Sequence, residues 1–87
     1  MGKLSQEEME RIVREVCDAV SNVTDYYLFG TVGKEHWRDD GSVELTVYWS
    51  SSKSGDEWEE TWYVYDDGKI STENYNYDNV EQLKGDI

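Results

Sequence analysis

The chain lacks the residues on which most enzyme sites depend. Its 87 residues include one cysteine, one histidine and no proline. His36 has no second histidine or cysteine with which to share a zinc ion, and its place in an expected turn indicates a surface residue. The serines at 42 and 50–52 lack the Gly-x-Ser-x-Gly context of an activated nucleophile. We therefore predict no catalytic residue, no metal site, no cofactor and no enzymatic activity.

Cys17 has no partner for a disulfide within the chain. Its place in an apolar helical stripe predicts a reduced, buried thiol. The segment from Met1 to Glu8 has no apolar core of a secretion signal, and no stretch approaches the about 20 apolar residues that a membrane span needs. These features predict a cytoplasmic protein that does not contact a membrane.

Basic residues are scarce, because eight Lys and Arg stand against twenty Asp and Glu, for a net charge of −12. The chain has no basic cluster and no Gly-rich phosphate loop, so we expect no direct binding to nucleic acid. Asp66-Asp67-Gly68 and the Asn and Asp residues at 74–79 lack the ligand spacing of a calcium-binding EF-hand. A surface with this charge attracts a basic protein.

Aromatic residues, by contrast, are abundant. Four Trp and seven Tyr contribute to an aromatic content of 14%, which is well above that of a disordered acidic tail. No repeat, low-complexity linker or break in composition divides the chain, so residues 1–87 are predicted to form a single domain. A domain of this size has a thin core, so we expect no deep substrate cavity.

The first predicted element is a helix over about residues 6–21. Ser5 and Glu8 have the spacing of a capping box, and Leu4 with Met9 has that of a hydrophobic staple. Behind this start, apolar residues recur at helical spacing and form one buried stripe. The residues of this stripe are Met9, Ile12, Val13, Val16, Cys17 and Val20.

From Thr24 onward the pattern changes to a period of two and predicts strands near 25–34, 43–51, 57–66 and 69–75. Gly41, Gly55 and Gly68 each end a turn segment that requires a positive φ, which indicates consecutive hairpins. Asp78 with Glu81 repeats the capping pattern, and Gly85 offers a C-terminal cap for a short final helix or turn. The predicted fold is α+β, with an N-terminal helix packed on one face of a four-stranded antiparallel meander sheet.

Alternation assigns residues to the two faces of this sheet. The helix-facing set includes Val43, Leu45, Val47 and Trp49 in the second strand and Trp58, Trp62 and Val64 in the third. Glu60 shares the phase of the two tryptophans, and an unpaired buried carboxylate is costly, so we expect it at the end of the sheet or re-aimed by a bulge. In the first strand, Leu28, Val32 and Tyr26 are expected inside and Tyr27, Phe29 and Thr31 outside, although the inverse assignment fits nearly as well.

The other face of the sheet, which a single helix leaves uncovered, combines carboxylates with tyrosine rings. Because the chain from residue 44 onward is its more acidic half, we expect most of the net charge on the sheet. Glu57 and Glu59 are about 6.8 Å apart on a strand, which is comparable to neighbouring phosphates in one nucleic-acid strand. The candidate partner-binding residues are Glu44, Tyr48, Asp56, Glu57, Glu59, Glu60, Tyr63, Tyr65, Glu73 and Tyr75.

These observations favour an acidic protein-binding inhibitor that mimics a nucleic acid. Its partner would be a basic, nucleic-acid-binding effector such as a nuclease, as for phage-encoded anti-CRISPR and anti-restriction proteins. The alternative is an immunity protein or antitoxin that neutralises a basic toxin, and a third reading is an accessory domain. Either a monomer or a homodimer is compatible with the sequence, because an exposed edge strand can pair with a second copy.

Overall fold

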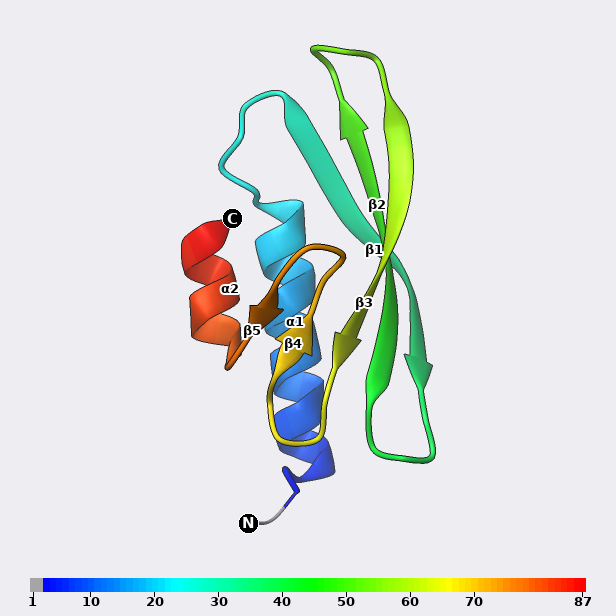
Figure 1. The fold of residues 1–87 in the computed structure, drawn as a ribbon, viewed down its shortest axis with the longest axis vertical. Helices are drawn as coiled ribbons and strands as arrows, with labels where there is room; N and C mark the ends of the chain where they lie inside the picture. Colours follow the sequence, from blue (N-terminus) through cyan, green and yellow to red (C-terminus); the bar gives the residue numbers. More distant parts are fainter. Residues whose placement is uncertain (1–2) are drawn as a thin grey trace.

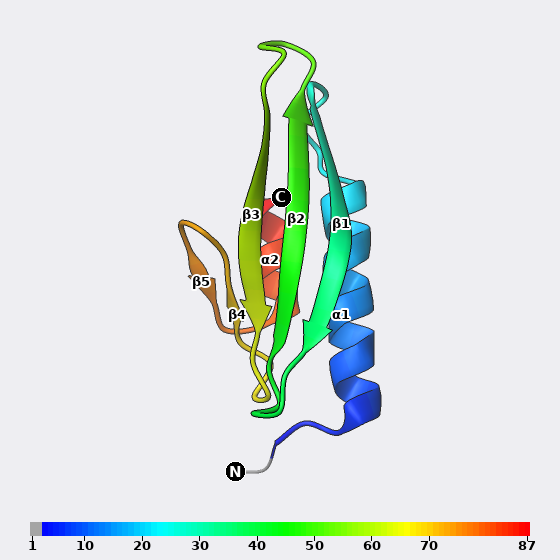
Figure 2. The same ribbon diagram turned by 90° about the vertical axis from the view of Figure 1, so that its right-hand side faces the viewer.

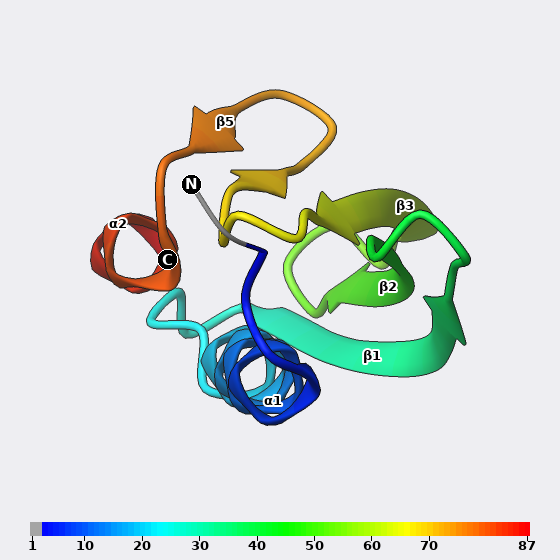
Figure 3. The same ribbon diagram turned by 90° about the horizontal axis from the view of Figure 1, so that it is seen from below.

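The computed structural model describes residues 3–87 and confirms the predicted α+β class (Figure 1). All five strands form one antiparallel sheet in the order β1-β2-β3-β4-β5. Both helices lie on the same side of this sheet, which curves around them when seen along the long axis (Figure 3). The elements are α1 (Gln6–Ser21), β1 (Leu28–Trp37), β2 (Val43–Ser51), β3 (Glu57–Val64), β4 (Ile70–Ser71), β5 (Asn76–Tyr77) and α2 (Val80–Asp86).

The start of α1 is fixed by the predicted capping box. Ser5 Oγ accepts a hydrogen bond from the Glu8 N–H at 3.1 Å, and Glu8 Oε1 accepts one from the Ser5 N–H at 3.0 Å. The hydrogen bond from the Ser5 backbone, and after it the Ser5 side chain, lowers the pKa of the Glu8 carboxyl. Because the two capping bonds satisfy N–H groups that the helix itself leaves free, they set the boundary at the residue that the sequence predicts.

The first strand lies three residues later than predicted, at Leu28–Trp37, and the third ends at Val64 instead of near residue 66. Asp25 ends the loop after α1 with a local turn, since its Oδ1 accepts the Tyr27 N–H at 2.9 Å and its carbonyl accepts the Leu28 N–H. β1 therefore begins at Leu28, and Tyr26, which was expected inside, is 84% exposed. Tyr27 is also exposed and precedes the strand.

The predicted fourth strand over 69–75 is instead a small hairpin of β4 and β5. Thr72 Oγ1 accepts the Tyr75 N–H at 3.1 Å, and the Thr72 N–H donates to the Tyr75 carbonyl at 2.8 Å. This side-chain turn competes with the sheet ladder and reverses the chain after only two strand residues. The sheet consequently has three long strands and two short ones.

A bulge at Gly33 shifts the register of β1 against β2 between Val32 and Lys34. Before the bulge, Leu28 and Val32 point toward the helices, as predicted. After it, Glu35 and Trp37 face the helix side and His36 the opposite side. His36 is exposed, as expected, but it lies in a strand and not in a turn.

The turn glycines and the second helix are only partly as predicted. Gly41, Gly55 and Gly68 all have positive φ, which confirms the three hairpin turns. α2 is capped by Asn79 and not by Asp78, because Asn79 Oδ1 accepts the Gln82 N–H at 3.0 Å. Gly85 lies inside α2 and does not end it, since Ile87 occupies the C-cap.

The core lies between α1, α2 and the helix side of β2 and β3. Val43, Leu45 and Val47 of β2 are fully buried, as their alternation predicts. Trp49 packs closely over β1 at Gly30, where an added Cβ would lie 2.4 Å from the indole ring. Cys17 is half-buried at the edge of this core, and burial raises the pKa of its thiol. The other core side chains are Met9, Ile12, Val13, Val16, Val20, Trp62, Val64, Ile70, Val80 and Leu83.

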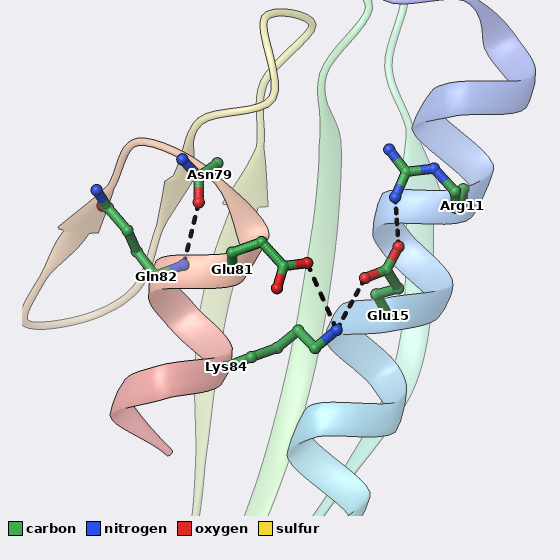
Figure 4. Close-up of polar contacts among 6 residues, drawn as sticks. All are labelled: Arg11, Glu15, Asn79, Glu81, Gln82 and Lys84. Carbon is green, nitrogen blue, oxygen red and sulfur yellow. Dashed lines mark hydrogen bonds and ion pairs between the residues drawn. The ribbon is translucent and has the colours of Figure 1, made fainter.

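Polar contacts attach α2 to α1 and to β5. Lys84 Nζ donates to Glu15 Oε1 at 3.1 Å, and Glu15 also accepts a hydrogen bond from Arg11 (Figure 4). The hydrogen bond from Lys84, and after it that from Arg11, lowers the pKa of Glu15, and the same bond raises the pKa of Lys84. Tyr77 donates from its hydroxyl to Asp86 Oδ2 at 2.6 Å, and burial followed by this contact raises the pKa of Tyr77 to about 12.

Replacing Lys84 with methionine is expected to lower the melting temperature in a manner that depends on pH. Because the pKa of Glu15 is lowered, its ion pair stabilises the fold at pH values above 4.5, the ordinary pKa of the group. This contribution is lost as the pH falls through the pKa of Glu15 in the folded protein. Because the pKa of Lys84 is raised, the same ion pair stabilises the fold at pH values below 10.5, the ordinary pKa of the group. This contribution is lost as the pH rises through the pKa of Lys84 in the folded protein. Thermal unfolding followed by circular dichroism at several pH values measures the difference between Lys84→Met and the wild type.

The matched control is Lys69→Met, which removes the same charge from a turn. There, Lys69 Nζ lies 3.9 Å from Asp67 Oδ2. That pair is exposed and is expected to contribute little. The Lys84→Met deficit should be largest near neutral pH and shrink below 4.5. Equal deficits for the two variants at every pH would show that the contact between α1 and α2 does not stabilise the fold.

Candidate partner-binding face

The side of the sheet opposite to the helices, here called the open face, is turned toward the viewer in Figure 2. Neither α1 nor α2 covers it, because both pack on the other side. Its residues form cross-strand rows that run from β1 over β2 to β3. The rows are Phe29–Ser50–Glu57, Thr31–Tyr48–Glu59, Lys34–Thr46–Thr61 and His36–Glu44–Tyr63.

A groove of about 580 Å³, here called the acidic groove, occupies the first two rows. Ser50 is small and lies between Phe29 of β1 and Glu57 of β3, so the surface is hollowed over β2. Phe29 is 60% exposed although it is a large apolar residue. The lining residues, none of them basic, are Phe29, Gly30, Thr31, Tyr48, Trp49, Ser50, Glu57, Trp58 and Glu59.

Tyr48 is held in place by the bulge in the neighbouring strand. A Cβ added at Gly33 would lie 2.2 Å from Tyr48 Cε2, so the tyrosine ring packs directly against the glycine backbone. This contact requires glycine, because any side chain at position 33 would displace the ring. The ring therefore packs against β1 at one end of the acidic groove.

The other end of the open face is mixed in charge. Tyr63 and Tyr65 stack with ring centroids 6.3 Å apart, and the Arg38 guanidinium lies 5.6 Å from the centroid of Tyr63. Lys34 and His36 of β1 are exposed near this end, and His36 is the register partner of Glu44. The open face is thus acidic around the β2–β3 turn and close to neutral around the β1–β2 turn.

The structure brings together only part of the predicted binding set. Glu44, Tyr48, Glu57, Glu59 and Tyr63 share the open face, as predicted. Of the remaining residues, Glu60 lies on the opposite side of the sheet, and the others lie around the border of the open face. Tyr65 directly follows β3, Asp56 precedes it, and Glu73 and Tyr75 lie in the turn between β4 and β5.

The expectation that most of the net charge lies on the sheet is wrong. Acidic residues are spread over the helices, the turns and the strands, and only some of those in the strands face outward on the open face. Strand residues with a carboxylate are Glu35, Glu44, Glu57, Glu59 and Glu60, whereas α1 alone carries Glu7, Glu8, Glu10, Glu15 and Asp18.

Glu60 lies on the helix side of the sheet, midway along β3 and opposite Val47, so its expected position at the sheet's end is wrong. β3 pairs with β2 without a bulge. The Glu60 carboxylate stays on the helix side of the sheet because three indole N–H groups donate hydrogen bonds to it there. Trp49 and Trp62 donate to Oε1 at 3.2 and 2.9 Å, and Trp58 donates to Oε2 at 3.1 Å. These hydrogen bonds to a charged acceptor offset the cost of partial burial.

We call Glu60 and these three tryptophans the indole cluster. The β2–β3 hairpin extends past the end of α1 (Figure 1). The indole cluster lies on the helix side of this hairpin, where Trp49 and Trp62 are buried and Trp58 is 41% exposed. The cluster joins β2 to β3 on the side of this projecting hairpin opposite to the acidic groove. Trp49 and Trp58 also border the groove, although their indole rings lie on the helix side of the sheet.

Sequence reasoning missed Lys34, His36 and Arg38 as neighbours of the open face, because it ended the first strand at residue 34. The signal that could have placed them is Gly33, since a glycine inside a strand pattern often marks a bulge. With a slip of one residue at Gly33, the alternation continues to Trp37.

Compared with family models, curated proteins and solved structures, the chain matches none. Within residues 3–87, no helix is both long and apolar enough to cross a bilayer. The same residues contain no group of three His, Cys, Asp or Glu side chains placed to hold one metal ion.

Replacing Glu60 with leucine is expected to destabilise the protein by about 2–4 kcal/mol, because it leaves three indole N–H groups without their acceptor. Glu60→Gln, which keeps one acceptor oxygen, should lose less. Urea unfolding followed by circular dichroism measures both changes. Glu59→Leu is the matched control, since its carboxylate is exposed on the other face. A loss in Glu60→Leu no larger than in Glu59→Leu would show that the indole cluster does not stabilise the fold.

Proposed function

We propose that the protein is an acidic inhibitor that binds a basic protein and occupies the site where that protein holds nucleic acid. The observation that carries this proposal is the acidic groove. It has a volume of about 580 Å³, it lies on the face that neither helix covers, and its charged lining residues are Glu57 and Glu59. Exposed apolar rings beside carboxylates exceed what solubility requires and are typical of surfaces that bind proteins.

The spacing of charge over the whole molecule supports the mimicry of a polyanion. The Cα atoms extend over 44 × 23 × 21 Å, so the protein is a short rod. A net charge of −12 along 44 Å is about one charge per 3.7 Å, close to the about 3.4 Å between charges on one strand of DNA. A long-range field of this kind steers a basic protein toward the inhibitor.

Close contacts would then depend on the acidic groove. Lys or Arg side chains of the partner would pair with Glu57 and Glu59, and guanidinium or apolar groups would pack on Phe29 and Tyr48. The partner would be a nucleic-acid-binding effector such as a nuclease, and both proteins would act in a cytoplasm. This is the activity of phage-encoded anti-CRISPR and anti-restriction proteins. The protein itself would carry no catalytic activity.

The double variant Glu57→Lys with Glu59→Lys is expected to weaken the complex by at least about tenfold. Both residues are exposed, so the fold should be retained. A pull-down with the wild-type protein from the native host, or from the organism on which it acts, identifies the partner by mass spectrometry. Titration with the purified partner then gives the affinities of the variants, and circular dichroism checks their folding.

The matched control is Glu10→Lys with Asp18→Lys, which changes the net charge equally on the exposed side of α1. This control should lose much less affinity than the groove variant, because it affects only the long-range field. Equal losses in the two variants would show that the acidic groove is not the binding site.

Competition separates mimicry from other modes of binding. The partner's own DNA or RNA should displace the wild-type protein, and the affinity should fall as salt rises. A ternary complex that persists in excess nucleic acid would contradict mimicry. Capture of a toxin in place of a nucleic-acid-binding protein would favour the immunity function.

A further inference from the structure

The outer edge of β3 is only partly covered by the next strand. β4 pairs with β3 at Tyr63 and Val64 alone, whereas β3 begins at Glu57. The other side of β3 is paired with β2 from Glu57 to Val64. The first half of β3 is therefore a free edge of the sheet, next to the acidic groove.

The hydrogen bonds around β3 show which backbone groups face this edge. The Tyr65 N–H donates outward to the Lys69 carbonyl at 2.8 Å, and the Thr61 N–H donates outward to Glu73 Oε2 at 3.2 Å. The Asp56 carbonyl, one residue out of phase, accepts the Ser51 N–H on the β2 side. By the alternation of an antiparallel ladder, the N–H and C=O groups of Glu57 and Glu59 point outward, and no strand in the described part of the chain lies opposite them.

Glu73 marks one end of this free edge. Its carboxylate accepts the Thr61 N–H at the position where a longer β4 would supply a carbonyl oxygen. The chain of the β4–β5 turn then leads away from β3 (Figure 2). A strand added at Glu57 and Glu59 would therefore end against Glu73.

The side chains along the free edge specify the chemistry of the occupant. Glu57 and Glu59 point to the open face, so a second copy of this chain in the same position would place like charges together. An incoming strand with basic residues on that face would pair with them. On the helix side the edge presents Trp58, 41% exposed, which favours apolar residues at the alternate positions.

We infer that the free edge of β3 binds an extended basic segment of the partner as an additional antiparallel strand, with basic and apolar residues in alternation. This inference rests on the proposed function and assigns it a mode of contact. Main-chain hydrogen bonds to Glu57 and Glu59 hold the segment, and carboxylate contacts select it. The acidic groove, directly beside this strand, receives the side chains that point to the open face.

A capped peptide of alternating arginine and valine serves as the probe, because it needs no knowledge of the partner. Two control peptides accompany it. One carries N-methyl groups on alternate backbone nitrogens, which keeps the side chains but removes the peptide N–H groups that would donate to β3. The other has glutamate in place of arginine. Binding at up to millimolar peptide is followed by NMR, and amide exchange with solvent is measured with and without peptide.

The unmodified peptide is expected to slow the exchange of the Glu57 and Glu59 amides, and the N-methylated peptide should bind at least about tenfold more weakly. The acidic peptide should not bind. In the protein, Glu59→Lys should weaken peptide binding at least about tenfold. Glu44→Lys, which changes the same face but lies in the central strand β2, should have a much smaller effect.

Three results would each overturn strand addition. They are equal binding of the N-methylated and unmodified peptides, unchanged amide exchange at Glu57 and Glu59, and no binding of the unmodified peptide at millimolar concentration. The proposed function is tested separately by the affinity of the Glu57→Lys, Glu59→Lys variant for the captured partner. If that variant loses affinity while the peptide fails, only the mode of contact is wrong. If the peptide binds and the variant keeps its affinity for the partner, the proposed function is wrong.

Discussion

One layer of helices packs against a sheet that has two faces, and this constraint determines what the protein exposes. α1 and α2 bury the side of β2 that carries Val43, Leu45 and Val47. Residues 3–87 form no further element that could cover the opposite side, so Phe29 and Tyr48 remain at the surface. In a domain this small, an uncovered face with large rings follows from the topology, and its composition decides what it can bind.

The acidic composition imposes a second constraint, because self-repulsion at a net charge of −12 opposes compactness. Some carboxylates offset part of this cost because they accept hydrogen bonds from other residues of the chain. Glu8 accepts from the Ser5 N–H, Glu15 from Lys84, Glu60 from three indoles and Glu73 from the Thr61 N–H. Glu57 and Glu59 make no such contact among residues 3–87, which leaves them free for an interaction with another molecule.

Local signals predicted the fold well. Ser5 and Glu8 set the start of α1 three residues apart, and Gly41, Gly55 and Gly68 set the hairpins through their own backbone angles. The same kind of signal was present but misread at the C-terminus, where Asn79 and not Asp78 is the cap. The split of the last predicted strand also has a local cause, the turn between Thr72 and Tyr75.

The candidate site was harder to predict, because it depends on contacts between distant residues. At the bulge, the backbone of Gly33 packs against Tyr48 of the next strand. The sequence of β1 alone therefore does not show at which residue its alternation changes face. Glu60 and its donors were all recognised as belonging to one face. What the sequence could not show is that the indole N–H groups of Trp49, Trp58 and Trp62 converge on that carboxylate.

The indole cluster also determines how the protein can be observed. Three of the four tryptophans surround Glu60 near the projecting hairpin, and the fourth, Trp37, lies at the opposite end of β1. Most of the indole groups that give the protein its intrinsic ultraviolet emission therefore contact Glu60, on strands that border the acidic groove. Trp58, partly exposed there, makes this emission sensitive to whatever arrives at the neighbouring edge of the sheet. The native chain thus contains its own optical label for binding, with no dye or added residue.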